Sequence, residues 1–310
     1  MLLIDPRSSI VSPLEKELDA LIERIRGTKA IGTTRRGIGP AYAMRALRLT
    51  PTAGQLASGH FDTHPMKSFY EIVGLSYDNL EGWMKEYSSF IRPFISDVPH
   101  EISEMQERGE AVILEGSQGT MLDLLFGTYP YVTSSQTTAG FIHSSLGVKV
   151  KFDVLGVAKC YTTRVGSGPF PSEVHGPECE RIREAGNEYG STTGRPRRIG
   201  WLDLVLLRYA CRINNCKEVA LMKLDVLAEI KQPFVCISYD VEGREVKEYD
   251  GSFPLETAKP NLMSITSFYK EDVRKIPSGV REIINLVESE TSSHVGMLSY
   301  GQEREKTVEL

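Results

Sequence analysis

Residues 190–201 read GSTTGRPRRIGW and place three arginines within four residues, behind two adjacent threonines and between glycines. Glycine allows positive φ and lets the backbone approach a ligand closely. Hydroxyls and backbone N–H groups can then bind carboxylate or phosphate oxygens, and guanidinium groups can clamp those oxygens in pairs. A solvated basic loop is the alternative, but such a loop would not need this backbone freedom. The stretch therefore predicts an anion-binding loop that leads directly into an apolar helix over residues 201–213.

A second loop of the same chemistry lies nearer the start of the chain, where residues 31–40 read IGTTRRGIGP. A helix is predicted ahead of it. Ser12 as N-cap, Pro13 at the first helical position and Glu15 three residues after the cap form the pattern of a capping box, and Gly27 ends the helix. Two such loops in one chain suggest that several anionic groups are held together.

The overall composition is that of an ordinary globular protein, with 310 residues, 41% hydrophobic and 25% charged, and a net charge of −5. The acidic balance and the lack of a long basic run argue against a nucleic-acid partner. The five cysteines form an odd set without a Cys-x-x-Cys pair, which favours a reducing compartment and argues against structural zinc. No apolar run approaches the roughly 18 residues of a membrane helix, and the first residues do not form a signal peptide. We therefore expect a cytoplasmic protein that does not bind a membrane.

Apolar runs typical of buried strands recur along the chain, and loops rich in glycine and hydroxyl groups follow most of them. Strands are predicted over residues 111–114, 154–160, 218–222 and 294–298. Open α/β sheets bind ligands beyond the carboxyl ends of their strands. The chain is therefore predicted to be one α/β domain, residues 1–310, with a mostly parallel central sheet and flanking helices.

Helices and a hairpin account for much of the remaining sequence. A helix over residues 78–92 carries an apolar and aromatic stripe that is expected in the core, formed by Leu80, Trp83, Tyr87 and Phe90. A second amphipathic helix is predicted over residues 278–289. Residues 234–241 and 245–249 flank a glycine-containing turn and predict a hairpin at the periphery of the sheet.

Asp225 lies shortly after the predicted strand 218–222, behind Lys223. A carboxylate accepts two hydrogen bonds side by side, which matches the N1–H and the exocyclic amine of guanine, whereas adenine lacks this donor pair. The stem of Lys223 can lie along the base. Lys-Leu-Asp is common at helix starts, but its position behind a buried strand favours a guanine site. The amide of Gln118, in the loop after residues 111–114, is suited to a neutral carbonyl or amide edge.

In their order and content, these loops resemble the compact form of the adenylosuccinate synthetase family over residues 2–303. The resemblance is carried by the segments IGTTRRGIGPAY, EGSQGT, GTYPYVTSS with TTAG, TRVGSGPFP, GSTTGRPRRIGWLD and KLDVL. It implies a P-loop-NTPase-like fold and a GTP-dependent ligase of purine biosynthesis. Such an enzyme phosphorylates the O6 of IMP with GTP, and the amine of L-aspartate then displaces phosphate from the 6-phosphoryl-IMP to give adenylosuccinate.

The resemblance also implies roles for individual residues. IMP would be held by Thr34, Arg48, Gln118, Thr133 and Arg195, with Gln118 acting catalytically near the purine O6. Arg48 would reach the IMP site of the neighbouring subunit, which implies a homodimer. L-Aspartate would be bound by Ser191, Thr192, Thr193, Gly194, Arg195 and Arg197. GTP would be bound by Arg197, Lys223, Leu224, Asp225, Ser299, Tyr300 and Gly301.

One departure from the family pattern concerns the start of the chain. The family begins with a strand, a Gly-Asp-Glu-Gly-Lys-Gly phosphate loop and an Asn-Ala-Gly-His segment, which supply the magnesium-binding and base-catalytic Asp and the acid His. This sequence contains neither segment. We therefore expect a chain truncated relative to the family, with Leu2–Ile4 as the end of a strand and with the Mg²⁺ ligands mainly in the missing segment. Arg35 stands where the family usually has glycine.

Two alternatives to a complete synthetase stay open. The chain could be a non-catalytic or truncated nucleotide-binding subunit that is inactive alone and acts through dimerisation. It could also be a relative that acts on another purine monophosphate, because contacts that select the base can lie in the missing segment.

Overall fold

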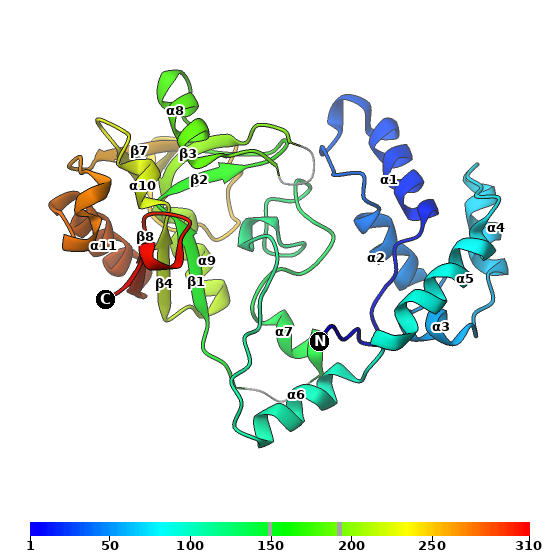
Figure 1. Ribbon diagram of the computed structural model, residues 1–310. Coiled ribbons are helices and arrows are strands. Elements are labelled where there is room, and N and C mark those ends of the chain that lie inside the picture. The colour runs from blue at the N-terminus through cyan, green and yellow to red at the C-terminus, as the bar shows by residue number, and fades with distance from the viewer. Residues whose placement is uncertain (148–150, 191–193) are drawn as a thin grey trace. The chain divides into compact units, whose positions relative to one another are not determined.

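The computed structural model describes residues 1–147, 151–190 and 194–310, and the chain divides into two compact units, Met1–Val150 and Lys151–Leu310 (Figure 1). The first unit is mainly helical, and the second contains the β-sheets. The prediction of one domain over residues 1–310 stays a prediction. Within the described ranges, no helix is long and apolar enough to cross a membrane.

The first unit is built from α1 (Pro13–Arg26), α2 (Ile38–Leu47), α3 (Ala53–Ser58), α4 (His64–Ile72), α5 (Leu80–Ile91), α6 (Val98–Glu107) and α7 (Phe141–Leu146). The start of α1 confirms the predicted capping box. Ser12 Oγ accepts a hydrogen bond of 3.1 Å from Leu14 N, and Glu15 Oε2 accepts one of 2.7 Å from Ser12 N. Glu15 Oε1 also accepts a hydrogen bond of 3.0 Å from the hydroxyl of Tyr70, which joins α1 to α4 in the interior.

Helix α5 confirms the predicted helix but not the predicted position of all its aromatic side chains. The buried residues of α5 are Leu80, Met84 and Ser88, which are spaced four residues apart on one face. Tyr87 and Phe90 are 40% and 67% exposed, so the expectation that they lie in the core is wrong. Their rings pack instead on the helix surface, with 6.4 Å between the two ring centres.

The predicted strand over residues 111–114 is also wrong. These residues have no regular secondary structure, and the side chain of Ile113 is 92% exposed. A strand needs a partner for its backbone groups, and the strand-like pairing within residues 1–147 consists of isolated bridges, Ile4 with Ile95 and Ser9 with Thr52. The strand end predicted at Leu2–Ile4 is present only as the first of these bridges.

In the described part of the second unit, a four-stranded sheet confirms the predicted parallel arrangement. Its strands are β1 (Leu155–Lys159), β4 (Glu218–Met222), β8 (His294–Ser299) and β9 (Thr307–Glu309), in the order β1-β4-β8-β9. β1, β4 and β8 run parallel, and β9 is antiparallel to β8. The carboxyl ends of β1, β4 and β8 therefore lie at one edge of the sheet (Figure 1).

A further sheet of mixed direction contains β2 (Tyr161–Arg164), β3 (Arg198–Asp203), β5 (Phe234–Val241), β6 (Arg244–Val246) and β7 (Lys259–Ser264). β3 and β5 are parallel, whereas β2 pairs antiparallel with β3, and β6 and β7 pair antiparallel with β5. β5 and β6 confirm the predicted hairpin. Because residues 198–203 form β3, the predicted anion loop leads into a strand, and the expectation that it leads directly into a helix is wrong.

The helices of the second unit are α8 (Pro177–Gly186), α9 (Leu204–Asn214), α10 (Leu224–Leu227) and α11 (Ser278–Thr291). Asp203, the last residue of β3, caps α9 by accepting a hydrogen bond of 3.1 Å from Leu206 N. Helix α11 packs against α9 and β8, and the predicted apolar face of α11 is buried. The α/β class is thus confirmed, as mixed sheets with flanking helices. Short 3₁₀ turns lie at Gly27–Lys29, Arg92–Phe94, Thr120–Leu122, Lys270–Lys275 and Arg304–Lys306.

Candidate functional site

The carboxyl ends of three parallel strands bring together residues that are far apart in the sequence. Lys159 ends β1, Lys223 and Asp225 follow β4, and Ser299 ends β8. β4 is hydrogen-bonded to both β1 and β8, so these residues come to one edge of the sheet. This is the position at which an open α/β sheet binds its ligands.

Asp225 has an unpaired carboxylate oxygen at this edge. Among the described residues, its buried Oδ1 has no hydrogen-bond partner. A buried acceptor without a donor costs roughly 1–3 kcal/mol, and such an atom in a native fold calls for a specific explanation. Lys223 lies two residues earlier in the left-handed region (φ 66°), and its Nζ donates a hydrogen bond of 3.0 Å to Gly186 O. The arrangement fits the predicted binding of a base with two adjacent donors.

The turn Ser299-Tyr300-Gly301 follows β8 at the same edge. Ser299 is buried, and its Oγ donates a hydrogen bond of 3.1 Å to Gly301 O. Tyr300 N donates one of 3.1 Å to Lys306 O, and the ammonium of Lys306 lies 5.4 Å from the centre of the Tyr300 ring. These contacts hold the predicted GTP-binding turn in one conformation next to β4.

Glu188 is a residue of this site that the sequence pattern did not predict. Its buried carboxylate accepts hydrogen bonds from Lys159 Nζ (2.7 Å), the hydroxyl of Tyr161 (2.6 Å) and Arg197 Nη1 (2.6 Å). Burial raises the pKa of Glu188, but these hydrogen bonds and charges outweigh burial and leave the pKa below its usual value. For Lys159 burial dominates, and its pKa is lowered despite the ion pair. The available sequence signal was the position of Glu188 two residues before Gly190.

Backbone hydrogen bonds close the stem of the predicted anion loop. Gly190 N donates to Arg195 O (2.8 Å), and Arg197 N donates to Glu188 O (2.9 Å). Gly194 has a φ of 64°, in the left-handed region that glycine favours, and its N donates to Gly190 O (2.7 Å). Arg195 is half-buried at the end of the loop. The other predicted aspartate-binding residues, Ser191, Thr192 and Thr193, lie outside the described residues.

Arg197 and Arg198 have different partners. Arg197 pairs with Glu188, whereas Arg198 pairs with Glu173, at 2.7 Å through its Nε and also through its Nη2. The Arg198 guanidinium also lies 5.3 Å from the centre of the Phe170 ring. Arg198 is thus engaged within the fold, and we assign it a structural role.

Two acidic side chains of α1 hold the second predicted anion loop. Glu23 Oε2 accepts a hydrogen bond of 2.7 Å from Gly32 N, and Asp19 Oδ2 accepts one of 3.0 Å from Gly37 N. Burial raises the pKa of Glu23, but several backbone N–H donors outweigh it and lower the pKa. Carboxylates of the protein itself therefore bind backbone donors of this loop. Thr34, which lies between Gly32 and Gly37 in this loop, is exposed.

Asp123 joins two segments on either side of Thr133 in the sequence, residues 125–126 and residues 137–138. It is fully buried, and its two oxygens accept hydrogen bonds from the backbone N–H groups of Leu125 (2.9 Å), Phe126 (3.0 Å), Thr137 (2.5 Å) and Thr138 (3.3 Å). Thr133 N donates a hydrogen bond of 2.9 Å to Leu122 O beside it. Asp123 lies between the segments EGSQGT and GTYPYVTSS that carry the resemblance, so no sequence motif pointed to it.

The beginning of α2 lies against the second of these loops. A Cβ atom added to Gly39 would stand 3.0 Å from Ser134 Oγ, so the first turn of α2 and the loop of Thr133 are neighbours. Gln118 is exposed with a φ of 61°. Arg48 is also exposed and ends α2 on the opposite side, about 15 Å along the helix axis.

The predicted site residues belong to both units. Thr34, Arg48, Gln118 and Thr133 belong to Met1–Val150, whereas Arg195, Arg197, Lys223, Asp225 and Ser299 belong to Lys151–Leu310. The described parts of the chain contain no group of three or more His, Cys, Asp or Glu side chains that could hold a metal ion.

Comparison with known proteins gives a consistent result. The family model for adenylosuccinate synthetase matches residues 1–308. The chain is similar to the adenylosuccinate synthetases of Helicobacter pylori strain P12 (39% identity over 100% of this chain and 78% of the relative) and Wolinella succinogenes (36% over 99% and 77%). It is similar in structure to the fully ligated adenylosuccinate synthetase of Plasmodium falciparum, with a TM-score of 0.89 and 32% identity over 100% of this chain and 78% of that one. The cyanophage S-2L succinoaminodeoxyadenylate synthetase shares the fold, with a TM-score of 0.60 and 18% identity over 100% of this chain and 69% of that one.

Proposed function

The chain belongs to the adenylosuccinate synthetase family, and we propose that its predicted site residues bind the three substrates of the family's reaction. That reaction is the GTP-dependent joining of IMP and L-aspartate in purine biosynthesis, catalysed by a GDP-forming ligase. Residues of Met1–Val150 and Arg195 bind IMP, and residues of Lys151–Leu310 bind L-aspartate and GTP. The observation that carries this proposal concerns GTP: the buried Oδ1 of Asp225, at the carboxyl edge of the parallel strands, has no hydrogen-bond partner among the described residues.

IMP is bound by Thr34, Gln118 and Thr133 in this proposal. The proximity of the first turn of α2 to the loop of Thr133, and the hydrogen bonds of Asp123 to residues 125–126 and 137–138, support it. The exposed amide of Gln118 acts catalytically beside the purine O6, where its NH₂ group donates a hydrogen bond to the oxygen on which charge develops. Arg195 adds a guanidinium, which is suited to a phosphate group.

Arg48 serves the IMP site of a second copy of the chain. This assignment is supported by its exposed position at the end of α2 opposite to the loop of Thr34. It makes the active form a homodimer. A cytoplasmic location stays a prediction.

L-Aspartate is bound by Ser191, Thr192, Thr193, Gly194, Arg195 and Arg197. The closed stem of the loop supports this role, because it fixes where the loop begins and ends. Arg197 is held by Glu188, so its guanidinium is placed before a ligand arrives. Preorganised positive charge binds an anion at a lower entropic cost than a mobile side chain does.

GTP is bound by Lys223, Leu224, Asp225, Arg197 and the turn Ser299-Tyr300-Gly301. Asp225 accepts the N1–H and the exocyclic amine of guanine, which supply the donors that its Oδ1 lacks among the described residues. Leu224 is fully buried, so it contributes through its backbone. The stem of Lys223 lies along the base.

The chemistry consists of two displacements at which the protein mainly positions groups and neutralises charge. Phosphoryl transfer from GTP to the O6 of IMP turns a poor leaving group into phosphate. The amine of L-aspartate then attacks C6, and phosphate departs. Gln118 orients the O6, and Arg195 and Arg197 balance the negative charge of the substrates.

Mg²⁺ is used by the family generally. Within the described ranges, no three His, Cys, Asp or Glu side chains are grouped as metal ligands. We propose that its ligands lie mainly in the part of the relatives that this chain does not cover.

The test is phosphate release by the purified chain with GTP, Mg²⁺, IMP and L-aspartate, with each component omitted in turn. Release that needs every component supports the ligase. Release from GTP without IMP would contradict the assignment. Calorimetric binding of IMP without any release would instead identify a non-catalytic nucleotide-binding subunit.

A further inference from the structure

The last turn of α9 brings two cysteines together. Cys216 N donates a hydrogen bond of 2.9 Å to Cys211 O, and Asn215 N donates to Arg212 O, with Asn215 in the left-handed region at φ 53°. This is a Schellman motif, in which the side chains at the two ends of the outer hydrogen bond meet. Standard bond lengths place the two cysteine Cα atoms at most about 6.8 Å apart. Disulfides span roughly 4.4–6.8 Å between Cα atoms.

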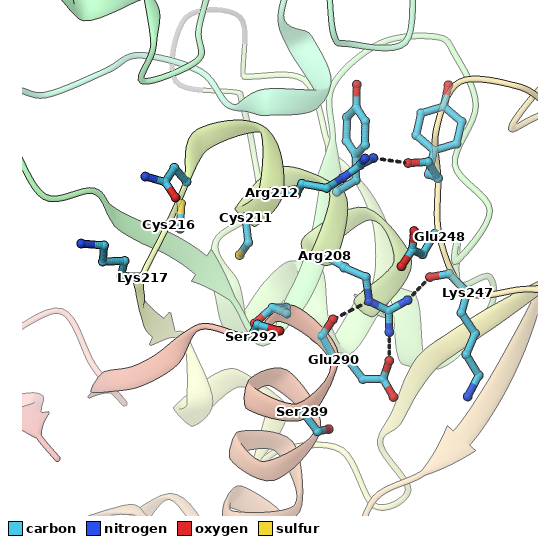
Figure 2. A pocket seen from close by; sticks show the side chains of 14 residues that line it. Arg208, Cys211, Arg212, Cys216, Lys217, Lys247, Glu248, Ser289, Glu290 and Ser292 are labelled. Carbon is cyan, nitrogen blue, oxygen red and sulfur yellow. Dashed lines mark hydrogen bonds and ion pairs between the residues drawn. The ribbon is translucent and has the colours of Figure 1, made fainter.

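Both cysteines line a pocket of about 740 Å³ within the second unit (Figure 2). Cys211 is 4% exposed and Cys216 is half-buried, so Cys216 is the more accessible thiol. Arg212 and Lys217 line the same pocket and are adjacent to the cysteines in the sequence. Their charges favour an anionic reagent.

The thiol pair differs chemically from the other cysteines. The Cys216 thiol lowers the pKa of Cys211, because a thiol donor beside a sulfur stabilises the thiolate, and the same contact raises the pKa of Cys216. The thiolate is the form that attacks a disulfide. Cys160, Cys179 and Cys236 are buried, and burial raises the pKa of Cys160 and Cys236.

We propose that Cys211 and Cys216 form a redox-active dithiol, a modification site that small anionic disulfides such as glutathione disulfide oxidise to an intramolecular disulfide. Cys216, the more accessible thiol, passes its proton to the Cys211 thiolate as its sulfur attacks glutathione disulfide. A mixed disulfide forms on Cys216, and the departing glutathione thiolate takes that proton from Cys211. The Cys211 thiolate then attacks Cys216 Sγ, forms the Cys211–Cys216 bond and displaces the second glutathione. Two protein thiols lose two electrons and two protons, and one glutathione disulfide is reduced to two glutathione molecules.

The test uses the full chain, equilibrated in glutathione buffers of increasing disulfide content and quenched in acid. Remaining thiols are blocked with N-ethylmaleimide in denaturant, and the protein is digested with trypsin without reduction. Trypsin cleaves after Arg208, Arg212 and Lys217, so the two cysteines fall in separate peptides, residues 209–212 and 213–217. Mass spectrometry should find these two peptides joined while Cys160 and Cys236 carry the blocking group. Dithiothreitol should separate them.

Two variants sharpen the test. Cys211→Ser should stop at a glutathione adduct on Cys216. Cys179→Ser, a matched change at a buried cysteine of α8, should leave the joined peptides in place. The proposal is overturned if the wild-type peptides stay separate under conditions that oxidise a free vicinal dithiol. It is also overturned if the wild type accumulates the Cys216 adduct without forming the second bond.

Discussion

Glu188 and Arg197 are joined twice, by an ion pair of 2.6 Å between Oε2 and Nη1 and by a hydrogen bond of 2.9 Å from Arg197 N to Glu188 O. The two residues stand on either side of the loop that opens at Gly190. Glu188 also binds Lys159 at the carboxyl end of β1. One buried carboxylate therefore couples the proposed aspartate loop to the ligand edge of the parallel strands.

Glu188→Gln should destabilise the fold and weaken the use of L-aspartate. Glutamine keeps a hydrogen-bond acceptor but removes the negative charge that pairs with both Lys159 and Arg197. Breaking a buried ion pair costs about 3–5 kcal/mol, and we expect the lower value because both cations are partly exposed. Urea unfolding and the KM for L-aspartate measure the two effects. Glu184→Gln, an exposed change on α8, is the control, and wild-type behaviour of the Glu188 variant would reject the coupling.

Asp203 predicts a dependence of stability on pH. Burial raises the pKa of Asp203 to about 6, although Tyr239 donates a hydrogen bond of 2.7 Å to Oδ2. As the pH falls, the Asp203 carboxylate of the folded protein therefore binds a proton at a higher pH than it does in the unfolded chain. The stability from this group is fully present below the unfolded pKa of 3.8 and is lost as pH rises through 6.

Asp203→Asn should remove this dependence while keeping an acceptor for Tyr239. Relative to the variant, the wild type should lose up to roughly 3 kcal/mol of unfolding free energy between pH 4 and pH 7. Urea unfolding across this range measures the difference. A difference that does not change with pH would show that Asp203 does not titrate there.

Parts of the fold could be predicted because the signal is local. Ser12 and Glu15 lie within one turn of each other, and residues 219–222 are apolar throughout, as a strand buried on both faces requires. Residues 111–114 have the same composition, but composition does not reveal whether a neighbouring strand is available. The helical spacing likewise placed Tyr87 on an apolar stripe of α5. It did not reveal that a different face, with Leu80 and Met84, packs into the core.

The site residues also fall into those that the sequence could place and those that it could not. The positions of Asp225 and Ser299 after predicted strands could be read from the sequence, and parallel strands bring their carboxyl ends to one edge. Their binding of GTP stays a prediction. Glu188 and Asp123 could not be predicted, because their roles depend on partners that other segments supply. Lys159 lies 29 residues before Glu188, and Thr137 lies 14 residues after Asp123.

Asp225→Asn should relax the preference for GTP over inosine triphosphate. Asparagine cannot accept both the N1–H and the exocyclic amine side by side, and a hydrogen bond to a charged group contributes about 1.5–3 kcal/mol. We expect the ratio of the two kcat/KM values to fall roughly 10- to 100-fold. Asp250→Asn, at an exposed site, is the control. An unchanged ratio would place the base elsewhere.

Arg195→Leu should raise the KM for L-aspartate and for IMP. Leucine removes a guanidinium that can hydrogen-bond both anions, and a loss of roughly 10-fold or more is expected for each. Steady-state kinetics with one substrate varied at a time measures both. Arg181→Leu, an exposed change on α8, should leave both KM values as in the wild type. Equal kinetics for the two variants would remove Arg195 from the site.

Asp123→Asn should loosen the loops of Gln118 and Thr133 and thereby weaken IMP binding. The carboxylate accepts from two backbone N–H groups on each oxygen. An amide keeps one oxygen and turns its NH₂ toward the other two donors, which leaves each of them unpaired at about 1–3 kcal/mol.

Amide hydrogen exchange distinguishes this indirect effect from a direct contact with IMP. In Asp123→Asn, exchange should speed up at Phe126 or Thr137, whichever faces the NH₂ group, in parallel with weaker IMP binding by calorimetry. Asp78→Asn, an exposed change in the same unit, should alter neither measurement. Weaker binding with unchanged exchange would mean that the Asp123 carboxylate meets the nucleotide itself. Its full burial and its hydrogen bonds to four backbone donors argue against that outcome.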